Sequence, residues 1–413
     1  MEASTLSLAV IGAGPVGLAL ALHAAQTLPH ARVTLFDARA VGTDVSGDPR
    51  TLALSLGSVQ ILQRLGAWRA DSAQPILEVH VSQAPPSMPA LLGARFGEPA
   101  LRIRAVDEAV PMLGAVMSYG ALVAPLQAAW LAAEHAEPAR LHGRFGTSVT
   151  ALKNLADGVE VDAGIAERFD LAVIAEGGIF AGPERALATR GRPGWRHDYG
   201  QTAWVGQVTF EDGPMHPAGV AYERFTRHGP AALLPLKDGG AALVWCVARD
   251  DDPVEPLDDR QRVAVLNTLF HPDAGRIAGV TALKPFALGL QAERSLTDGR
   301  SVRIGNAAQT LHPVAGQGMN LGLRDVHALV AALRRATAPG RGTPGDVDAA
   351  LRRVEWQRAP DRWGMILATD FLARSFTWKL PGAGAARGFG LFALQALGPV
   401  KSAIARQMMF GSR

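Results

Sequence analysis

The sequence predicts an α/β fold in which a parallel-sheet domain is interrupted by an antiparallel β-sheet and followed by a helical C-terminal segment. Three observations lead to this expectation. A short apolar run near the N-terminus ends in a glycine-rich turn, strand-like segments fill residues 203–248, and a second strand with a glycine-rich turn comes only after residue 300. The two glycine-rich pieces must meet in space, because neither is a complete α/β unit alone.

The first elements follow from local patterns. Residues 6–11 are an apolar run that predicts a buried strand, residues 16–28 predict a helix, and residues 32–37 predict a second strand. Helical periodicity returns at residues 59–68 and 122–134, Asp157-Gly158 indicates a hairpin, and residues 170–175 predict a compact buried strand.

The middle of the chain changes character. Gly, Pro and Asp separate strand-like runs, which predicts an antiparallel sheet of about four to six strands; the runs are 203–210, 220–226, 231–235 and 241–248. A buried strand at 302–305, a helix at 320–336, an exposed linker at 338–344 and further helices complete the expected order.

Bulk composition excludes several classes of protein. The chain has 413 residues and 48% hydrophobic content, enough for one large or two intertwined domains. Lys plus Arg minus Asp plus Glu is 41 − 38 = +3, too little to suggest nucleic-acid binding. The single cysteine, Cys246, excludes an intrachain disulfide and a cysteine-based metal cluster, and we expect no metal. Such cysteine usage fits a reducing compartment.

The first chemical motif is Gly12-x-Gly14-x-x-Gly17. It follows a predicted strand, opens a helix, and has Asp37 at the end of the next strand, 37 − 17 = 20 residues beyond the last glycine. Gly12 permits the tight turn, Gly14 lets backbone approach a pyrophosphate, and Gly17 lets helix and strand pack closely. Asp37 can accept hydrogen bonds from ribose hydroxyls, which favours FAD or NAD over NADP. We therefore expect a Rossmann-like domain.

Two further motifs lie downstream. Residues 170–178 form a strand that ends in Glu176-Gly177-Gly178, a pattern that a plain strand and turn also explains. Residues 302–325 form the stronger motif, in which a strand ends at Gly305, Gly316 and Gly318 permit a tight loop, and a long helix follows. That helix presents its positive end to the loop, where it could stabilise an anionic reduced flavin.

The C-terminal region has an uneven charge. Residues 371–413 contain no Asp or Glu, and basic side chains alternate there with apolar ones. Such a tail is typical of contact with an anionic lipid surface. A helix packed on its own domain with its Arg heads in water has the same composition, and both interpretations stay open. No apolar run reaches the roughly 18–20 residues of a spanning helix, and the N-terminus lacks a signal-peptide pattern. We expect a cytoplasmic protein, soluble or peripheral on the inner face of the membrane.

The three motifs, in this order and spacing, resemble those of the class A flavoprotein aromatic hydroxylases. Residues 222–230 (YERFTRHGP), 243–246 (LVWC) and 305–313 (GNAAQTLHP) are similar to the ubiquinone-biosynthesis hydroxylases, the 2-polyprenyl-6-methoxyphenol hydroxylase family. The resemblance covers nearly the whole chain. It implies an FAD cofactor, NAD(P)H or another electron donor, O₂, and a polyprenylated phenol that is hydroxylated through a flavin C4a-hydroperoxide.

The resemblance also implies site residues. The three glycines of the first motif would hold the FAD pyrophosphate, Asp37 the adenosine ribose, and Asn306, beside Gly305, the ribityl chain. Arg50 would approach the cofactor after the second strand. The flavin ring would be lined by Gly316, Gln317, Gly318, Met319 and Asn320. Most of the wider class has Gly-Asp where this chain has Gly305-Asn306, and Ala-Asp-Gly where it has Ala175-Glu176-Gly177; the longer acid leaves its contact undefined.

Catalytic roles are less defined. Pro313 is a candidate for the wall above the flavin, and His312 for a base that activates the phenol, although a histidine beside a proline is more often structural. The one further G-x-G-x-x-G, at residues 340–345, overlaps the expected linker and follows a predicted helix instead of a strand, so it does not indicate a nicotinamide domain. The donor would therefore bind transiently or be another protein.

We expect residues 1–75, 100–185 and 295–335 to form a discontinuous FAD-binding domain. Residues 76–99 and 186–294 would form the β-rich substrate domain, and 345–413 the C-terminal helical segment. Two other functions remain open: a soluble catabolic hydroxylase of small phenols, and a non-catalytic flavin-binding subunit of a quinone-biosynthesis assembly. Other quinone-biosynthesis proteins are further expected partners.

Overall fold

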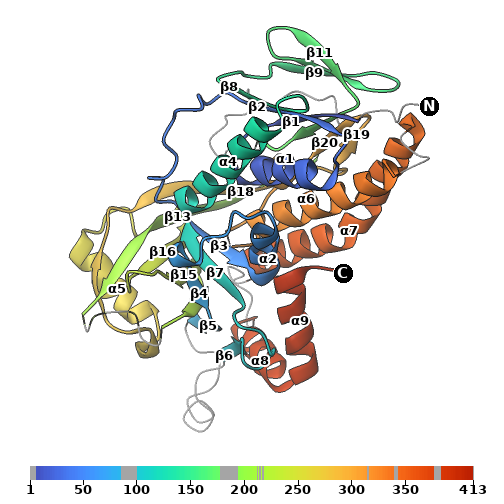
Figure 1. The fold of residues 1–413 in the computed structure, drawn as a ribbon. Helices are drawn as coiled ribbons and strands as arrows, with labels where there is room; N and C mark the ends of the chain where they lie inside the picture. Colours follow the sequence, from blue (N-terminus) through green and yellow to red (C-terminus); the bar gives the residue numbers. More distant parts are fainter. Residues whose placement is uncertain are drawn as a thin grey trace.

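The computed structural model describes residues 6–84, 100–176, 194–211, 213, 215, 218–313, 316–338, 343–375 and 383–412. A parallel sheet and its helices form one part, a larger sheet forms a second, and C-terminal helices lie along both (Figure 1). Gly177 and Gly178 of the second motif lie outside the described residues, as do residues 339–342 of the expected linker.

The smaller part is built on a six-stranded sheet with the order β19-β20-β12-β1-β2-β8. Its four central pairings are parallel and only β19 with β20 is antiparallel. The strands are β1 (Ser7–Ile11), β2 (Arg32–Asp37), β8 (Leu141–Phe145), β12 (Leu171–Ile174), β19 (Thr297–Asp298) and β20 (Ser301–Arg303). The strand before the first glycine-rich motif (β1) and the strand before the last one (β20) therefore lie in one sheet, as the sequence predicts.

Side-chain alternation along β1 covers both faces of this sheet. Leu8 and Val10 pack in one cluster with helices α1 (Pro15–Thr27), α4 (Tyr119–Ala136) and α6 (Gln317–Ala336). Ala9 and Ile11 pack instead against a small antiparallel sheet on the opposite face. That sheet has the order β11-β10-β9, with β9 (Ala151–Asn154), β10 (Val159–Asp162) and β11 (Ala166–Phe169), and the turn at Asp157-Gly158 joins its first two strands.

The larger sheet has nine strands, not the expected four to six. It runs β21-β18-β13-β16-β15-β14-β5-β6, with β17 beside β13. The strands are β5 (Glu78–Ala84), β6 (Ala100–Arg104), β13 (Trp195–Phe210), β14 (Val220–Thr226), β15 (Gly229–Pro235), β16 (Ala241–Ala248), β17 (Ile277–Val280), β18 (Lys284–Ala292) and β21 (Gln309–Thr310).

The sequence predicts too few strands for this sheet for a physical reason. Four of the extra strands, β5, β6, β18 and β21, come from sequence on either side of the middle region, and a pairing such as Tyr222 with His80 is not visible in local periodicity. The pairs are antiparallel except for β14 with β5, which is parallel. The strand at residues 100–104 lies in this sheet, although the expected boundaries assign it to the cofactor-binding part; the division into domains stays a proposal.

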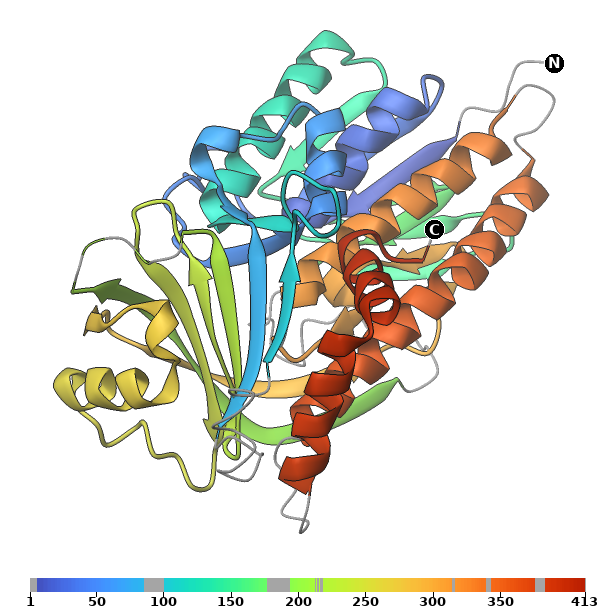
Figure 2. The same ribbon diagram turned by 90° about the horizontal axis from the view of Figure 1, so that it is seen from below.

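Helices cover the two faces of the larger sheet. Helix α5 (Asp259–Leu269) packs with Tyr222, Leu233 and Trp245 on what we call the outer face. The inner face meets α2 (Leu56–Arg64), α8 (Ala383–Ala396) and α9 (Gly398–Phe410), together with the end of α7 (Pro344–Ser375). Figure 2 shows α5 and the C-terminal helices on opposite sides of this sheet. The last small sheet, β3-β7-β4, joins β3 (Thr51–Ser55), β7 (Gly114–Ser118) and β4 (Gln74–Ile76) near α2.

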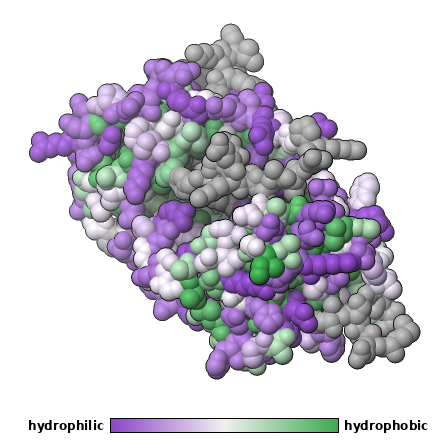
Figure 3. All heavy atoms as spheres, turned by 90° about the horizontal axis from the view of Figure 1, so that it is seen from above, coloured by the Kyte–Doolittle hydropathy of each residue, from purple (hydrophilic) through white to green (hydrophobic). Residues whose placement is uncertain are grey.

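Three short 3₁₀ turns complete the described elements: η1 (Ala70–Ser72), η2 (Pro272–Ala274) and η3 (Gly305–Ala307). The molecular face in Figure 3 is mainly hydrophilic, with small scattered hydrophobic areas. In the described part of the chain, no single helix is long and apolar enough to cross a membrane, while α8 and α9 together satisfy the length and composition but meet at a 94° bend.

Candidate functional site

The first glycine-rich turn leaves no room for side chains at two positions. Gly12 has a φ of +102°, and a Cβ there would lie 2.9 Å from Cγ of Glu176. A Cβ at Gly17 would lie 1.8 Å from the carbonyl oxygen of Gly12. Helix α1 therefore packs directly on the turn that ends β1, which is the reason the sequence needs glycine at both positions.

The N-terminus of α1 is open toward the turn. Gly14 is its N-cap with extended backbone, Pro15 is the first helical residue, and neither a capping side chain nor a first-turn acid is present. A Cβ at Gly14 would meet only the Tyr119 hydroxyl, at 3.6 Å. First-turn N–H groups at the positive end of a helix form an anion-binding site, so this turn fits a pyrophosphate.

Asp37 lies at the end of β2, beside the same turn. Its Oδ2 accepts the backbone N–H of Ala13 at 2.5 Å, and its Oδ1 accepts that of Arg39 at 2.7 Å. These two bonds fix the carboxylate and leave lone pairs for ribose hydroxyls. The Arg39 guanidinium donates to the Ala13 carbonyl and to Gln127, a brace that the sequence analysis missed.

Arg50 also lies near the first turn. Its guanidinium pairs with Asp48 at 2.7 Å and stacks over the Tyr119 ring, 4.2 Å from the ring centre. Because the Tyr119 hydroxyl borders Gly14, Arg50 and Tyr119 form one edge of the predicted FAD site. Burial raises the pKa of Tyr119, so it stays a neutral phenol.

The second glycine-rich segment meets the first one at Val16. Gly305 has a φ of +58°, and a Cβ there would lie 3.2 Å from Cγ2 of Val16. A Cβ at Gly322 would lie 2.7 Å from the same methyl and 3.0 Å from Cα of Gly305. The predicted meeting of the two distant segments is therefore confirmed, and Gly305 in η3 and Gly322 on α6 leave room for Val16 of α1.

Helix α6 begins at the second loop with an open end. Gly316, at φ +59°, is its N-cap in a left-handed conformation, and the cap has no side-chain hydrogen bond and no acid in the first turn. A Cβ at Gly318 would lie 3.7 Å from Oδ1 of Asn306. Gln317 is buried and Met319 packs on the core of the smaller part. This positive helix end, beside Asn306, fits the polar edge of a flavin.

Asn320 is fully hydrogen-bonded to protein groups. Its Nδ2 donates to the carbonyl oxygens of Ala53 and Gly316, and its Oδ1 accepts from the Ser55 N–H at 2.8 Å and the Ser58 hydroxyl at 2.7 Å. These four bonds use the whole capacity of the amide. The side chain therefore ties the loop before α6 to β3 and α2 and has no bond left for a ligand.

His312 is held away from solvent. It is 1% exposed, its Nε2 lies 2.9 Å from Oε1 of Gln201, and its ring packs edge-on against Tyr199. Burial lowers its pKa to about 4, so the imidazole is neutral at pH 7. These contacts hold Pro313, which is half-buried and begins the segment that leads to Gly316 and α6; we call residues 313–316 the flavin loop, after the ring that they are predicted to line.

Asp170 and Glu176 of the second motif make different contacts. The Asp170 carboxylate accepts from the N–H and the hydroxyl of Ser7, both at 2.7 Å, which fixes the start of β1. Glu176 instead abuts Gly12 at the first turn. Asp170 is thus a structural residue, and Glu176 borders the predicted site.

A buried ionic cluster behind the second turn was missed in the sequence. Asp325 on α6 accepts from Gln309 at 3.3 Å and from Arg358 on α7 at 2.7 Å, and its Oδ2 lies 3.4 Å from the Gly305 nitrogen. Arg358 also donates to Asp361 at 2.7 Å. The only sequence signal was a charged Arg324-Asp325 pair on an otherwise apolar helix face.

Comparisons with known proteins agree with this geometry. The model of the FAD-binding domain family matches residues 5–349. A ubiquinone hydroxylase of Rhodospirillum rubrum is 32% identical over 381 residues, 88% of this chain and 80% of that protein. The 3-demethoxyubiquinol 3-hydroxylase of Escherichia coli is 30% identical over 406 residues, 95% of this chain and 96% of that protein.

Solved structures show the same fold. The Klebsiella pneumoniae HpxO complex with FAD and uric acid superposes with a TM-score of 0.70 at 19% identity, covering 98% of this chain and 97% of that one. The p-nitrophenol 4-monooxygenase of Pseudomonas putida superposes at 0.68 and 16% identity, covering both chains fully (100% each). With a cradle that fits FAD and a family match over most of its length, the chain belongs to the FAD-binding domain family and is an FAD-dependent monooxygenase.

Proposed function

We propose that this protein hydroxylates the ring of a polyprenylated phenol in ubiquinone biosynthesis. The observation that carries the proposal is the contact between two helices with open ends, α1 and α6, at Val16, together with the bond that joins His312, just before the flavin loop, to Gln201 of the larger sheet. The ubiquinone hydroxylases that the chain resembles over most of its length support the substrate class.

The residues would divide the work as follows. Gly12, Gly14 and Gly17 with Asp37 would hold the adenine dinucleotide half of FAD. Asn306, together with Gly316 and the first turn of α6 (Gln317, Gly318 and Met319), would hold the ribityl chain and the flavin ring. Bound FAD, reduced by NAD(P)H or another donor, would activate O₂, of which one atom enters the ring and the other leaves as water. His312, through Gln201, would position Pro313 as a wall of the site, and Asn320 would keep the flavin loop in shape.

An experiment with two readouts tests the proposal. Purified protein should be yellow and retain FAD, and a short-chain 2-prenylphenol should accelerate NAD(P)H oxidation and give a hydroxylated product that mass spectrometry detects. If the protein retains FAD but makes no product with any reductant, the proposed hydroxylase activity is contradicted. Equal turnover of 4-hydroxybenzoate and the prenylphenol would favour the catabolic alternative.

We also propose that α8 and the start of α9 contact a membrane surface. Helix α8 lies on β6, where Gln395 accepts the Arg102 N–H, and leaves Phe389 and Phe392 68% and 43% exposed. Leu397 and Val400 continue this apolar surface. Two basic side chains of this region make contacts within the protein: Arg406 pairs with Glu108 at 3.5 Å, and the Lys401 ammonium donates to the Arg102 carbonyl.

Vesicle sedimentation tests this contact. The double variant Phe389→Ser/Phe392→Ser should lose binding to vesicles that contain anionic lipid, because the aromatic side chains supply the buried apolar area. Trp356→Ser is the matched control, since Trp356 is 80% exposed on α7 and lies outside this surface. If the double variant and the parent sediment equally, the membrane surface lies elsewhere or is absent.

A further inference from the structure

Glu223 is a carboxyl placed on the inner face of the large sheet. It lies in β14 and pairs with Ala232 of β15 and Val81 of β5. Its neighbours Tyr222 and Arg224 point to the outer face, where Tyr222 packs with the α5 cluster and Arg224 donates to Ser82. Since side chains alternate along a strand, Glu223 faces the C-terminal helices and the cofactor-binding part.

Around Glu223 the charged side chains come from the helices packed over the sheet: Arg374 pairs with Asp370 at the end of α7, and Arg387 of α8 donates to the Ser375 carbonyl. On the inner face of β14, β15 and β16, Glu223 is the one charged residue among the described positions, and Cys246 is the one other titratable group. Burial, followed by the Glu223 charge, raises the pKa of the Cys246 thiol. The remaining inner-face residues are Ala221, Phe225, Pro230, Ala232, Leu234, Ala242, Val244 and Ala248.

The Glu223 carboxyl is largely removed from water but is not fully enclosed by protein. Part of its surface remains accessible, yet burial raises its pKa to about 8. In the described part of the chain, neither a hydrogen bond nor an ion pair reaches it. A carboxyl that is largely withdrawn from water and whose pKa is raised by burial is a candidate ligand-binding group. A protonated carboxyl offers one donor and one acceptor.

The same sheet face leads to the flavin loop. Cys246 pairs with Ala203 on β13, and Gln201, two residues earlier on the same strand face, binds His312. His312 precedes Pro313 and the loop that ends at Gly316. Glu223 on β14 and the flavin loop, which His312 links to Gln201 of β13, therefore lie on the same face of the sheet but at different strands.

We propose that the Glu223 carboxyl hydrogen-bonds a ring oxygen of the phenolic substrate and selects uncharged phenols over aromatic carboxylates. The inference rests on the proposed function and makes its substrate class more specific. The apolar inner face suits a long hydrocarbon substituent, while an anionic carboxylate beside Glu223 would meet another acid, and the described inner-face positions of β14, β15 and β16 offer it no cation. A site built around a hydrogen bond discriminates strongly against ligands that leave its polar group unpaired.

Ligand binding to the FAD-loaded protein tests this inference without turnover. The probes are a 2-alkylphenol and the matching 2-alkylbenzoate, and the readout is the perturbation of the flavin visible spectrum. The parent should bind the phenol at least about tenfold more tightly than the benzoate at pH 6.5. Glu223→Leu should lose phenol affinity by about tenfold, and Glu223→Gln should keep most of it because the amide still donates and accepts.

The pH profile separates this role from a packing effect. Phenol affinity of the parent should fall as the pH rises through about 8, because the carboxyl ionises and loses its donor, while Glu223→Gln should stay flat. Glu160→Gln on β10 is the matched control and should behave as the parent does. Thermal unfolding checks that each variant is folded.

Two failures are distinguishable. A parent that binds and hydroxylates the phenol while Glu223→Leu matches it in affinity, selectivity and pH profile overturns the role of Glu223 alone. A parent that retains FAD but binds no phenol at any pH overturns the proposed function, and this inference with it.

Discussion

Gly17 has no space for a methyl group, because a Cβ there would overlap the Gly12 carbonyl oxygen at 1.8 Å. Gly17→Ala must push α1 away from the turn, and overpacking of this kind typically costs about 1–3 kcal/mol. We expect a lower urea midpoint and little bound FAD, measured by unfolding and by the visible absorbance of the purified protein.

Gly14→Ala is the matched control for that change. Its φ of −74° suits alanine, and the new Cβ would meet only the Tyr119 hydroxyl at ordinary contact distance. The protein should therefore keep its stability while FAD binds more weakly, because the methyl stands where backbone approaches the pyrophosphate. Equal loss of stability in the two variants would contradict the packing role assigned to Gly17.

At the residue scale the sequence predicted glycine and Asp37 placement, since those roles depend on spacing along one turn and its neighbouring strand. It could not predict the role of Asn320, whose partners Ala53, Ser55 and Ser58 lie more than 260 positions away in the chain. His312 is a similar case, because its partner Gln201 is 111 residues distant. Long-range hydrogen bonds leave no periodic signal.

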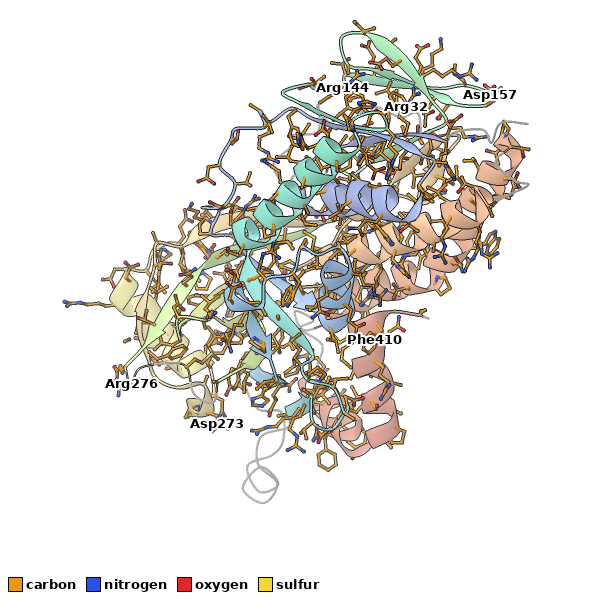
Figure 4. All side chains as sticks on the ribbon, viewed as in Figure 1. Arg32, Arg144, Asp157, Asp273, Arg276 and Phe410 are labelled. Carbon is orange, nitrogen blue, oxygen red and sulfur yellow. The ribbon has the colours of Figure 1, made fainter. Side chains whose placement is uncertain are left out.

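At the element scale, a buried ionic cluster joins α6, α7 and α9. The Asp361 carboxylate on α7 accepts hydrogen bonds from Arg358 at 2.7 Å, from Arg324 of α6 at 3.2 Å and from Gln407 of α9 at 2.9 Å. Arg324 also donates to the Met408 carbonyl. Figure 4 shows Phe410 at the end of α9, where Met409 and Phe410 pack on Gly57 of α2. The C-terminal helix is thereby tied to the helix that begins at the flavin loop.

Asp361→Ala should destabilise the protein by about 3–5 kcal/mol, because it leaves the buried Arg324 guanidinium without its carboxylate and Arg358 with Asp325 alone. Denaturant unfolding measures the loss. Asp348→Ala on the same helix is the control, since Asp348 pairs with Arg300 at 2.8 Å but is 43% exposed, and it should cost clearly less. A loss for Asp361→Ala no larger than that of the control would show that the cluster does not hold these helices together.

Helices and strands were predictable where one face repeats regularly. The strands at 32–37, 220–226 and 241–248 have the bounds that the sequence indicated, and the glycine-rich helix starts were placed within a few residues. Strand β18 was missed because Pro285 and Gly289 interrupt its pattern. Its pairing with β13 compensates in the folded chain, a tertiary effect that local sequence does not contain.

At the scale of the whole molecule, buried titratable groups set the pH of maximum stability. Burial lowers the pKa of His23, His80 and His312 to about 4 each, and raises that of Glu223 to about 8. The stability from a histidine with a lowered pKa is present above about pH 6.5 and is lost as the pH falls toward 4. The stability from a carboxyl with a raised pKa is present below about pH 4.5 and is lost as the pH rises toward 8.

The two effects oppose each other below about pH 6.5, where three histidines outweigh one carboxyl and unfolding takes up 3 − 1 = 2 net protons. Above about pH 6.5 only the Glu223 effect remains. The free energy of unfolding of the FAD-loaded protein, measured by urea denaturation from pH 4.5 to 8.5, should therefore peak near pH 6.5 and fall more steeply on the acid side. Glu223→Gln should remove the alkaline decline and leave the acid decline in place. A profile that is flat above pH 6.5 in the parent would mean that the carboxyl ionises freely, and that the sheet face around it is open to water.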